Sequence, residues 1–321
     1  MKKLLLLILL SVLYLPLHAQ EESRMFLHPG REVFVNFPSE VLGLGHHLTV
    51  YLPEKQVPLS RKYPVLYVLE ADTKSAAQAD LLNSTQNQKV IVVGITFDEK
   101  DYEDADKIAR FFSRELIPYI DTNYLTFNRP SGRMIAGRGS YATKALIKLA
   151  SMPELFDGVV MTHPSDDWSA SGLRDDQRIL VRGGRASVAY AQKVLEGRGL
   201  EYGTNFALRF VGENEPLFST IAVDYLLASP AELGIKKVVA KLSDKTLPLG
   251  GKTFLTVTAL LDNGMRFDVI PVSLRMSPPF LRWQATQTAL QAISGAETGR
   301  VKISGRVGKK PFSVKIKLKK Q

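Results

Sequence analysis

Short apolar runs alternate with amphipathic stretches along the first two thirds of the chain. Residues 63–69 and 90–95 are nearly continuous apolar runs, which indicates strands buried on both faces. Residues 105–119 carry apolar side chains at a helical period. Further strands are expected at residues 48–52, 134–136, 158–161, 178–181 and 206–211, and further helices at residues 143–150 and 189–196. This alternation predicts an α/β domain with a mostly parallel central sheet covered by helices on both faces.

The pattern changes near Ser229-Pro230 to a period of two, and no helical period follows. Residues 253–261 run into Asp262-Asn263-Gly264, a turn signal. Residues 314–318 alternate apolar side chains with lysine, and further strands are expected at residues 267–272 and 299–305. Short strands separated by Gly, Asn and Pro predict an all-β sandwich. We therefore expect two domains, residues 20–229 and residues 231–321.

A basic start, an apolar run and a small residue open the chain. Met1-Lys2-Lys3 precedes the leucine-rich residues 4–17, and Ala19 precedes polar sequence. This order predicts a signal peptide over residues 1–19, cleaved after Ala19; an uncleaved N-terminal anchor is the alternative, although the run is short for a membrane span. No later stretch is apolar enough to cross a membrane, so we expect no span after cleavage. The expected location is the periplasm, the cell surface or the medium of a bacterium.

Cysteine is absent from the sequence, which excludes disulfides, thiolate metal sites and a cysteine nucleophile. Export without disulfides suits a bacterial envelope. The histidines after the signal segment are His28, His46, His47 and His163, and they show no zinc-type spacing. We expect no metal site and no cofactor.

Basic charge is concentrated at the C-terminal end. Residues 231–321 contain 17 Lys and Arg against 5 Asp and Glu, whereas the whole chain has a net charge of +10. Such a region can contact an acidic glycan, another envelope ligand or a protein partner. A solvated lysine-rich face that keeps edge strands from pairing is an equally simple explanation. In an exported protein we expect no nucleic-acid partner.

Residues 134–142 combine an apolar strand end, a Gly-rich turn and the start of a helix. The turn contains Gly137, Arg138, Gly139 and Ser140. A nucleophile elbow of the G-x-S-x-G type has the same order of strand, turn and helix, with a serine at the strained position of the turn.

With these residues the chain resembles the esterases of the esterase D type, α/β-hydrolases that include enterochelin esterases, S-formylglutathione hydrolases and feruloyl esterases. The resemblance covers roughly residues 30–228 and rests on residues 63–69, 92–95, 115–121, 135–137 and 153–158, which occur in the family order. It implies an α/β-hydrolase three-layer sandwich. The C-terminal region resembles a bacterial Ig-like domain, on residues 249–253 and 256–259.

The family elbow reads Ala-Gly-His-Ser-Met-Gly-Gly, and it aligns with this chain without a gap. Arg138 then stands at the histidine position and Gly139 at the serine position. Ser140 is the alternative nucleophile, but the elbow needs small neighbours, and Arg138 would then be one of them. The simpler interpretation is that Ser140 caps the start of a helix.

The other two members of the triad are also replaced. The resemblance aligns Glu215 with the histidine base, and Arg185 follows the strand that should lead to the acid. The family's Leu-Asp-Gly oxyanion loop is Leu69-Glu70-Ala71 here. Without a base in reach, a serine is a weak nucleophile.

Two acidic sets could in principle support other chemistry. Acid–base catalysis would need side chains such as Glu70, Asp72, Asp98 and Glu215 to converge, and nothing in the spacing requires this. The acidic residues between positions 98 and 106 lack the spacing and glycine of a calcium loop, and we interpret them as a solvated loop.

These patterns favour an exported, catalytically inactive esterase-like protein that acts as a binding or scaffold module in the cell envelope. Its expected ligand-binding residues are Asp72, Arg138, Ser140, Tyr141 and Trp168, where Arg138 could meet an anionic group beside a helix N-terminus. The alternatives are an active carboxylic-ester hydrolase that uses Ser140 with a non-standard base, and a structural protein that interacts through its Ig-like domain alone.

Overall fold

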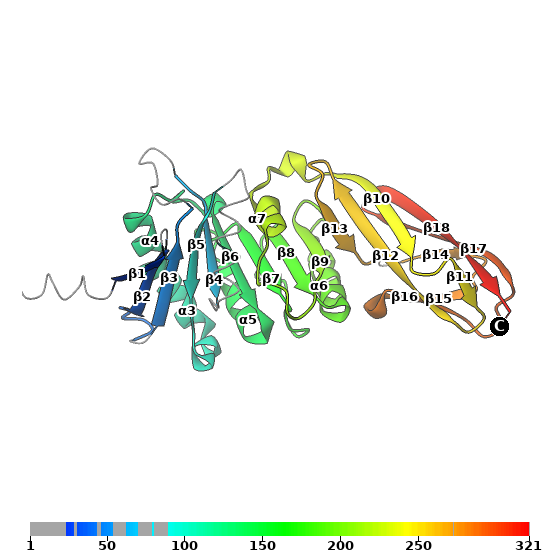
Figure 1. Cartoon of the computed structure of the whole chain (residues 1–321), viewed down its shortest axis with the longest axis horizontal. Coiled ribbons are helices and arrows are strands. Elements are labelled where there is room, and N and C mark those ends of the chain that lie inside the picture. Colours follow the sequence, from blue (N-terminus) through cyan, green and yellow to red (C-terminus); the bar gives the residue numbers. More distant parts are fainter. Residues whose placement is uncertain are drawn as a thin grey trace, which may run out of the picture. The chain divides into compact units, whose positions relative to one another are not determined.

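A computed structural model describes residues 24–28, 31–43, 46–53, 62–69, 79, 89–271 and 273–320 (Figure 1). The chain forms two compact units, residues 1–128 and residues 129–321. The expected signal segment, residues 1–19, and the proposed site residue Asp72 lie outside the described residues. The predicted boundary near residue 230 differs from this division and stays a prediction.

The first unit contains a sheet with the strand order β1-β2-β3-β5-β4. Its strands are β1 (Arg24–His28), β2 (Arg31–Phe37), β3 (His46–Tyr51), β4 (Val65–Leu69) and β5 (Ile91–Ile95). Strands β4 and β5 pair in parallel, and all five residues of each are buried. Their continuous apolar sequence is the reason, because a strand covered on both faces needs apolar side chains at every position.

Helices α3 (Ala105–Phe111) and α4 (Ile117–Asn123) belong to the first unit and are joined by a π-helical segment, Phe112–Leu116. Together they form the helix predicted at residues 105–119. The helix begins at Asp104, whose side chain accepts a hydrogen bond of 2.8 Å from the Lys107 backbone N–H.

The second unit begins with four parallel strands in the order β6-β7-β8-β9 (Figure 1). These are β6 (Arg133–Arg138), β7 (Gly158–Thr162), β8 (Arg178–Gly183) and β9 (Phe206–Phe210), with helices α5 (Gly139–Ala150), α6 (Arg185–Gly197) and α7 (Thr220–Leu227). The sequence predicted all of these except α7. Most residues of α7 are apolar, so it lacks the polar face that marks an amphipathic helix.

The rest of the second unit consists mainly of β-strands. Strands β10 (Ile235–Leu242), β12 (Lys252–Leu261), β13 (Arg266–Val269), β15 (Leu281–Gln284) and β16 (Ala289–Ala292) belong to one sheet, in which β12 pairs with β10, β13 and β16. Strands β11 (Thr246–Pro248), β14 (Arg275–Ser277), β17 (Gly299–Val307) and β18 (Lys310–Lys319) form a second, four-stranded sheet in the order β11-β18-β17-β14. Two sheets agree with the predicted β-rich region. Its Ig-like nature stays a prediction.

The β-rich region is joined to the parallel strands directly. Strand β13 pairs antiparallel with β9, with Asp268 opposite Leu208. The buried Tyr202 hydroxyl donates a hydrogen bond of 2.7 Å to the Asp268 carbonyl, and the Asp268 carboxylate accepts one of 2.9 Å from the Phe210 backbone N–H. The sheet of the parallel strands therefore continues into the β-rich region.

Replacing Asp268 with asparagine is expected to make stability less dependent on pH. Burial raises the pKa of the Asp268 carboxyl group, against the hydrogen bond from Phe210. The stability that this group contributes is complete below its unfolded pKa of about 4 and is lost as pH rises through the raised pKa. Asp268→Asn should therefore raise the free energy of unfolding at neutral pH relative to the wild type, since asparagine can still accept from Phe210. Urea unfolding from about pH 4 to about pH 7 measures this; an unchanged pH slope would contradict it.

Candidate functional site

Strand β6 turns sharply into helix α5 at Gly139. The φ angle of Gly139 is +78°, in the left-handed region that favours glycine. A Cβ atom placed on Gly139 would meet nothing within 4 Å. In a nucleophile elbow the catalytic serine occupies the strained backbone position of this turn. Here that backbone position belongs to a residue without a side chain.

Small residues allow α5 to approach β6 closely. A Cβ atom on Gly137 would lie 2.9 Å from the Ala142 Cβ and 3.1 Å from the Leu146 Cδ1. Within the helix, the Thr143 hydroxyl donates a hydrogen bond of 2.7 Å to the Gly139 carbonyl. The backbone of the turn thus has the tight packing that an elbow needs.

Arg138 holds the loop that follows β9. Its Nη1 donates a hydrogen bond of 2.6 Å to the Glu213 carbonyl oxygen, and its Nη2 donates to the Glu215 carbonyl oxygen. Arg138 is half-buried, whereas the side chains of Glu213 and Glu215 are exposed. The structure therefore brings together two residues of the predicted site, Arg138 and Glu215, through the backbone of the loop.

Ser140 is exposed and lies in the first turn of α5. Within the described part of the chain, its hydroxyl makes no hydrogen bond to a histidine or a carboxylate. The neighbouring Tyr141 side chain is 53% exposed. Both side chains are accessible beside the elbow.

His163 follows β7 and has a φ of +49°. Its backbone N–H donates a hydrogen bond of 2.7 Å to the Arg182 carbonyl. Its Nε2 lies 3.1 Å from the Gly212 carbonyl oxygen. A proton on Nε2 makes this a hydrogen bond to the same loop that Arg138 holds, which gives His163 a part in fixing that loop.

Arg185 stands after β8, near the expected position of the acid. Its guanidinium lies 4.8 Å from the centre of the Phe210 ring, and its Nη1 donates to the Thr288 hydroxyl. A cation over an aromatic ring is a favourable packing arrangement. The Arg185 side chain therefore links the start of α6 to the end of β9 and to the β-rich region.

Arg182, at the end of the buried strand β8, was missed by the sequence reasoning. Its side chain is 1% exposed, and its Nη1 donates a hydrogen bond of 2.7 Å to the Pro216 carbonyl. Burial, assisted by the nearby Arg209, lowers the pKa of the Arg182 guanidinium to about 10. The signal was an arginine directly after the apolar residues 179–181, because a charged side chain in a buried strand needs a partner.

Trp168 does not join this group of residues. It is 5% exposed, its ring packs edge-on against Tyr190 at 6.2 Å, and its carbonyl accepts a hydrogen bond from the Tyr190 hydroxyl. This burial does not support the expected contact of Trp168 with a ligand.

One residue of the acidic loop between positions 98 and 106 is not solvated as expected. Asp101 is buried, and its Oδ2 accepts a hydrogen bond of 3.0 Å from the Asp98 backbone N–H. His46 Nδ1 lies 3.9 Å from the same oxygen. Asp101 therefore shapes the loop from inside, whereas its acidic neighbours are exposed. Among the described residues, no cluster of three or more His, Asp and Glu side chains could hold a metal ion.

Comparison with known proteins gives a family match over residues 39–206, to the family model described as "Putative esterase". The uncharacterized protein YjcH of Bacillus subtilis is 27% identical over 146 residues, which are 41% of this chain and 60% of that protein. This chain thus covers less than two thirds of that relative.

Two solved esterases are among the similar structures. An S-formylglutathione hydrolase from Agrobacterium tumefaciens is 16% identical, with a TM-score of 0.48, over 66% of this chain and 99% of that one. A ferulic acid esterase from Anaeromyces mucronatus is 16% identical, with a TM-score of 0.46, over 63% of this chain and 90% of that one.

Within the described residues, no helix is both long and apolar enough to span a membrane.

Proposed function

Because the chain belongs to this esterase family, we propose that it is an esterase-like protein that has lost catalysis and acts as a binding or scaffold module in a bacterial cell envelope. The observation that carries the proposal is the glycine at the strained position of the elbow. A serine triad needs a nucleophile at that position, a base within hydrogen-bond reach and an acid that orients the base.

The missing nucleophile is the first support. Gly139 adopts a φ of +78°, and space for a side chain is open beside it. The turn therefore keeps the backbone geometry of an elbow while offering no hydroxyl group there.

The contacts of the arginines are the second support. Arg138 binds the backbone of the loop in which the family has its histidine, and Glu215 stands at the aligned position. Arg185, near the acid position, is occupied with Phe210 and Thr288. A positive side chain near the acid position cannot stabilise an imidazolium, which is the role of the acid in a triad.

An active esterase that uses Ser140 is the alternative. Ser140 is exposed beside the elbow, and this exposure favours access to a substrate. A serine hydroxyl needs a base to take its proton, and no described side chain hydrogen-bonds to it. The proposal therefore assigns Ser140 to the helix start and, with Tyr141 and Arg138, to the accessible surface at which a ligand can bind.

Export is part of the proposal and rests on the basic and apolar pattern of residues 1–19. N-terminal sequencing of the protein from its native host tests it. A chain that begins at Gln20 agrees with cleavage after Ala19, and a chain that keeps Met1 contradicts it.

Turnover of a p-nitrophenyl ester tests the loss of catalysis. The wild-type protein and Ser140→Ala are expected to release p-nitrophenol at the same rate, close to that of buffer. Loss of one triad member costs several powers of ten in rate, about 10⁴-fold or more, and here all three positions differ. A wild-type rate well above that of Ser140→Ala would establish the alternative.

A further inference from the structure

Seven cationic side chains share one face of the four-stranded sheet. We call it the basic face, and its residues are Arg275, Arg300, Lys302, Arg306, Lys315, Lys317 and Lys319. The face follows from the register, since residues opposite one another on paired strands, and residues two apart along a strand, point to the same side. All seven are exposed, and strands β11, β14, β17 and β18 contain no Asp or Glu.

The register places like charges opposite one another. Arg300 is paired with Lys317, and Lys302 with Lys315. Like charges directly opposite on neighbouring strands destabilise a sheet. An anion bound between the strands would relieve this repulsion.

Protection of sheet edges does not account for Lys302 and Lys317. Lys302 is flanked on both sides, by Ser277 of β14 and Lys315 of β18. Lys317 is likewise flanked by Arg300 of β17 and Thr246 of β11. Lysines that prevent edge-to-edge pairing are needed where a strand has a free edge. At Lys302 and Lys317 both edges of the strand are already paired.

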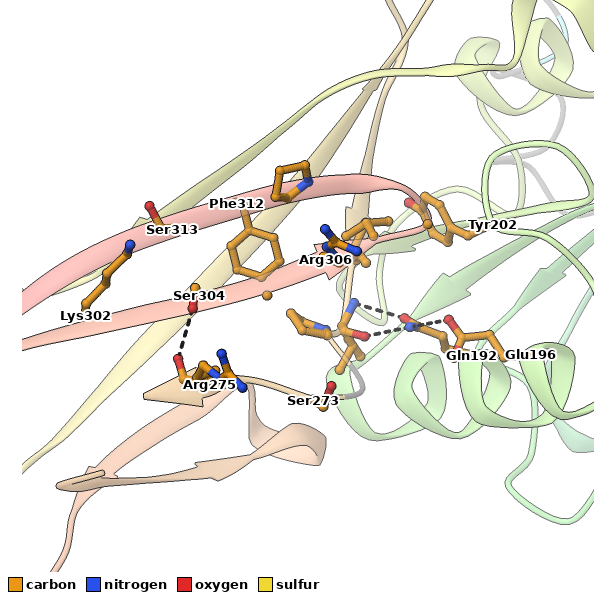
Figure 2. A pocket seen from close by; sticks show the side chains of 17 residues that line it. Gln192, Glu196, Tyr202, Ser273, Arg275, Lys302, Ser304, Arg306, Phe312 and Ser313 are labelled. Carbon is orange, nitrogen blue, oxygen red and sulfur yellow. Dashed lines mark hydrogen bonds between the residues drawn. The ribbon is translucent and has the colours of Figure 1, made fainter. Parts of the chain in front are cut away.

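A pocket of about 660 Å³ lies where this face meets α6 (Figure 2). Its lining includes Arg275, Lys302 and Arg306 from the basic face and a single carboxylate, Glu196. Hydroxyl groups line it as well, from Ser273, Ser304 and Ser313. Among the residues that the structure describes, none forms an ion pair with these three cations.

The side of the pocket nearest α6 is held in place by Gln192. Its amide nitrogen donates hydrogen bonds to the Ile270 carbonyl, at 2.6 Å, and to the Glu196 carboxylate, at 2.9 Å (Figure 2). Its amide oxygen accepts from the Ile270 backbone N–H at 3.0 Å. Glu196 and the chain around Ile270 thus have fixed positions in the pocket wall.

An aromatic ring forms another part of the wall. Phe312 lies opposite Gly305, and a Cβ atom on Gly305 would come within 2.6 Å of the Phe312 ring. The absence of a side chain at residue 305 lets the ring lie against the backbone of β17. Pro311 also lines the pocket, on the side of the cations, because it pairs with Arg306. The pocket therefore combines apolar surface, hydroxyl groups and positive charge, which together match a charged sugar.

Other polyanions fit less well. The exposed large apolar side chains of the described residues are Phe127, Tyr141, Val239 and Phe254, and none belongs to the basic face or the pocket. Stable attachment to a membrane surface takes a second signal besides basic charge, such as apolar side chains that insert into it. Single-stranded nucleic acid stacks its bases on exposed aromatic rings. The basic face offers neither kind of contact.

We propose that the basic face and its pocket bind an acidic polysaccharide, a chain of carboxylate-bearing sugars. One sugar occupies the pocket, with its carboxylate near Arg275, Lys302 and Arg306 and its ring against Pro311, which the register places opposite Arg306 on the same face. The neighbouring sugars follow the cations of β17 and β18. The site is separate from the elbow, so the proposal holds whether or not the protein hydrolyses esters.

Calorimetric titration with hexagalacturonate tests the site. We expect measurable binding that weakens as salt is raised, because salt screens exposed charges. Neutral maltohexaose, vesicles of phosphatidylglycerol and a single-stranded oligodeoxynucleotide are titrated beside it and should bind at least about tenfold more weakly. No binding of hexagalacturonate, or equal binding of the vesicles or the oligonucleotide, would overturn the proposal.

Two triple variants separate a site from general attraction. Arg275→Gln/Lys302→Gln/Arg306→Gln removes the pocket cations, whereas Lys236→Gln/Lys237→Gln/Lys241→Gln removes the same charge from β10 of the other sheet. The first should weaken hexagalacturonate binding at least about tenfold, and the second by less than about twofold. Equal losses would show that net charge alone attracts the sugar and would refute the site.

Glu196→Gln supplies a variant with the opposite expected sign. It removes the carboxylate from the lining and keeps the oxygen that accepts from Gln192, so binding of hexagalacturonate should become tighter. Weaker or unchanged binding contradicts the proposed placement of the sugar carboxylate.

Should the triple variant fail to fold, the wild-type melting temperature must still rise with hexagalacturonate and not with maltohexaose.

Discussion

Replacing Gln192 with leucine is expected to lower the free energy of unfolding by about 3 kcal/mol. The side chain is 4% exposed and forms two hydrogen bonds with the backbone of Ile270 and one with Glu196. Leucine fills a similar volume but leaves the buried Ile270 N–H and C=O groups without their partner. Each buried group left unsatisfied costs about 1–3 kcal/mol.

Urea unfolding measures this loss, with Lys193→Leu as the control. Lys193 is the next residue of α6 and is exposed, so its replacement by leucine should change stability by less than about 0.5 kcal/mol. A Gln192→Leu protein as stable as this control would mean that α6 does not anchor the β-rich region through Ile270. The same variant should also weaken the binding of hexagalacturonate, because Gln192 and Ile270 both line the pocket.

Replacing Arg138 with methionine is expected to destabilise the protein by about 2 kcal/mol. The substitution keeps most of the apolar stem and removes the two hydrogen bonds to the carbonyl groups of Glu213 and Glu215. Hydrogen bonds to a charged group contribute about 1.5–3 kcal/mol each when well shielded, and partial exposure of this pair reduces the sum.

Arg282→Met is the matched control and should have little effect on unfolding in urea, because Arg282 is exposed in β15 and lies opposite the uncharged Gln291. The loop after β9 should in addition exchange its amide hydrogens faster in Arg138→Met, since the side chain holds that loop. An Arg138→Met protein with wild-type stability and unchanged exchange would show that Arg138 does not hold this loop.

Apolar patterning predicted the strands and helices that make up the core. Runs such as residues 63–69 and 90–95 became β4 and β5, because five consecutive apolar residues have few stable arrangements other than a strand buried on both faces. Elements without a distinct period escaped prediction. Strands β14, β15 and β16 have three or four residues each, and Pro278-Pro279 separates the first two, so no alternation is long enough to identify them.

The backbone of the elbow was predictable, whereas its side-chain contacts were not. Local sequence aligned Gly139 with the family serine, and the positive φ at this residue agrees with a strained turn. The partners of Arg138 lie 75 and 77 residues further along the chain, and nothing in the local sequence connects them. For the same reason the local sequence did not show that Trp168, which was predicted as a ligand contact, is buried against Tyr190.

The sequence showed the excess of lysine and arginine near the C-terminus, but it did not show how these side chains are arranged on the sheet. The alternation of residues 314–318 predicted that lysines point away from the core, as they do in β18. Which cations oppose one another depends on strand register, and register is set by pairing across the hairpin of β17 and β18. The basic face and its pocket therefore required the structure.

Intact-mass detection of fluorophosphonate labelling tests the central claim most directly. The reagent modifies serines that a neighbouring base activates, as in serine hydrolases. The wild-type protein, shown to be folded by circular dichroism, is predicted to gain no adduct under conditions in which an active serine hydrolase is labelled completely. A single adduct on the wild type that is absent from Ser140→Ala would contradict the account and identify Ser140 as a working nucleophile.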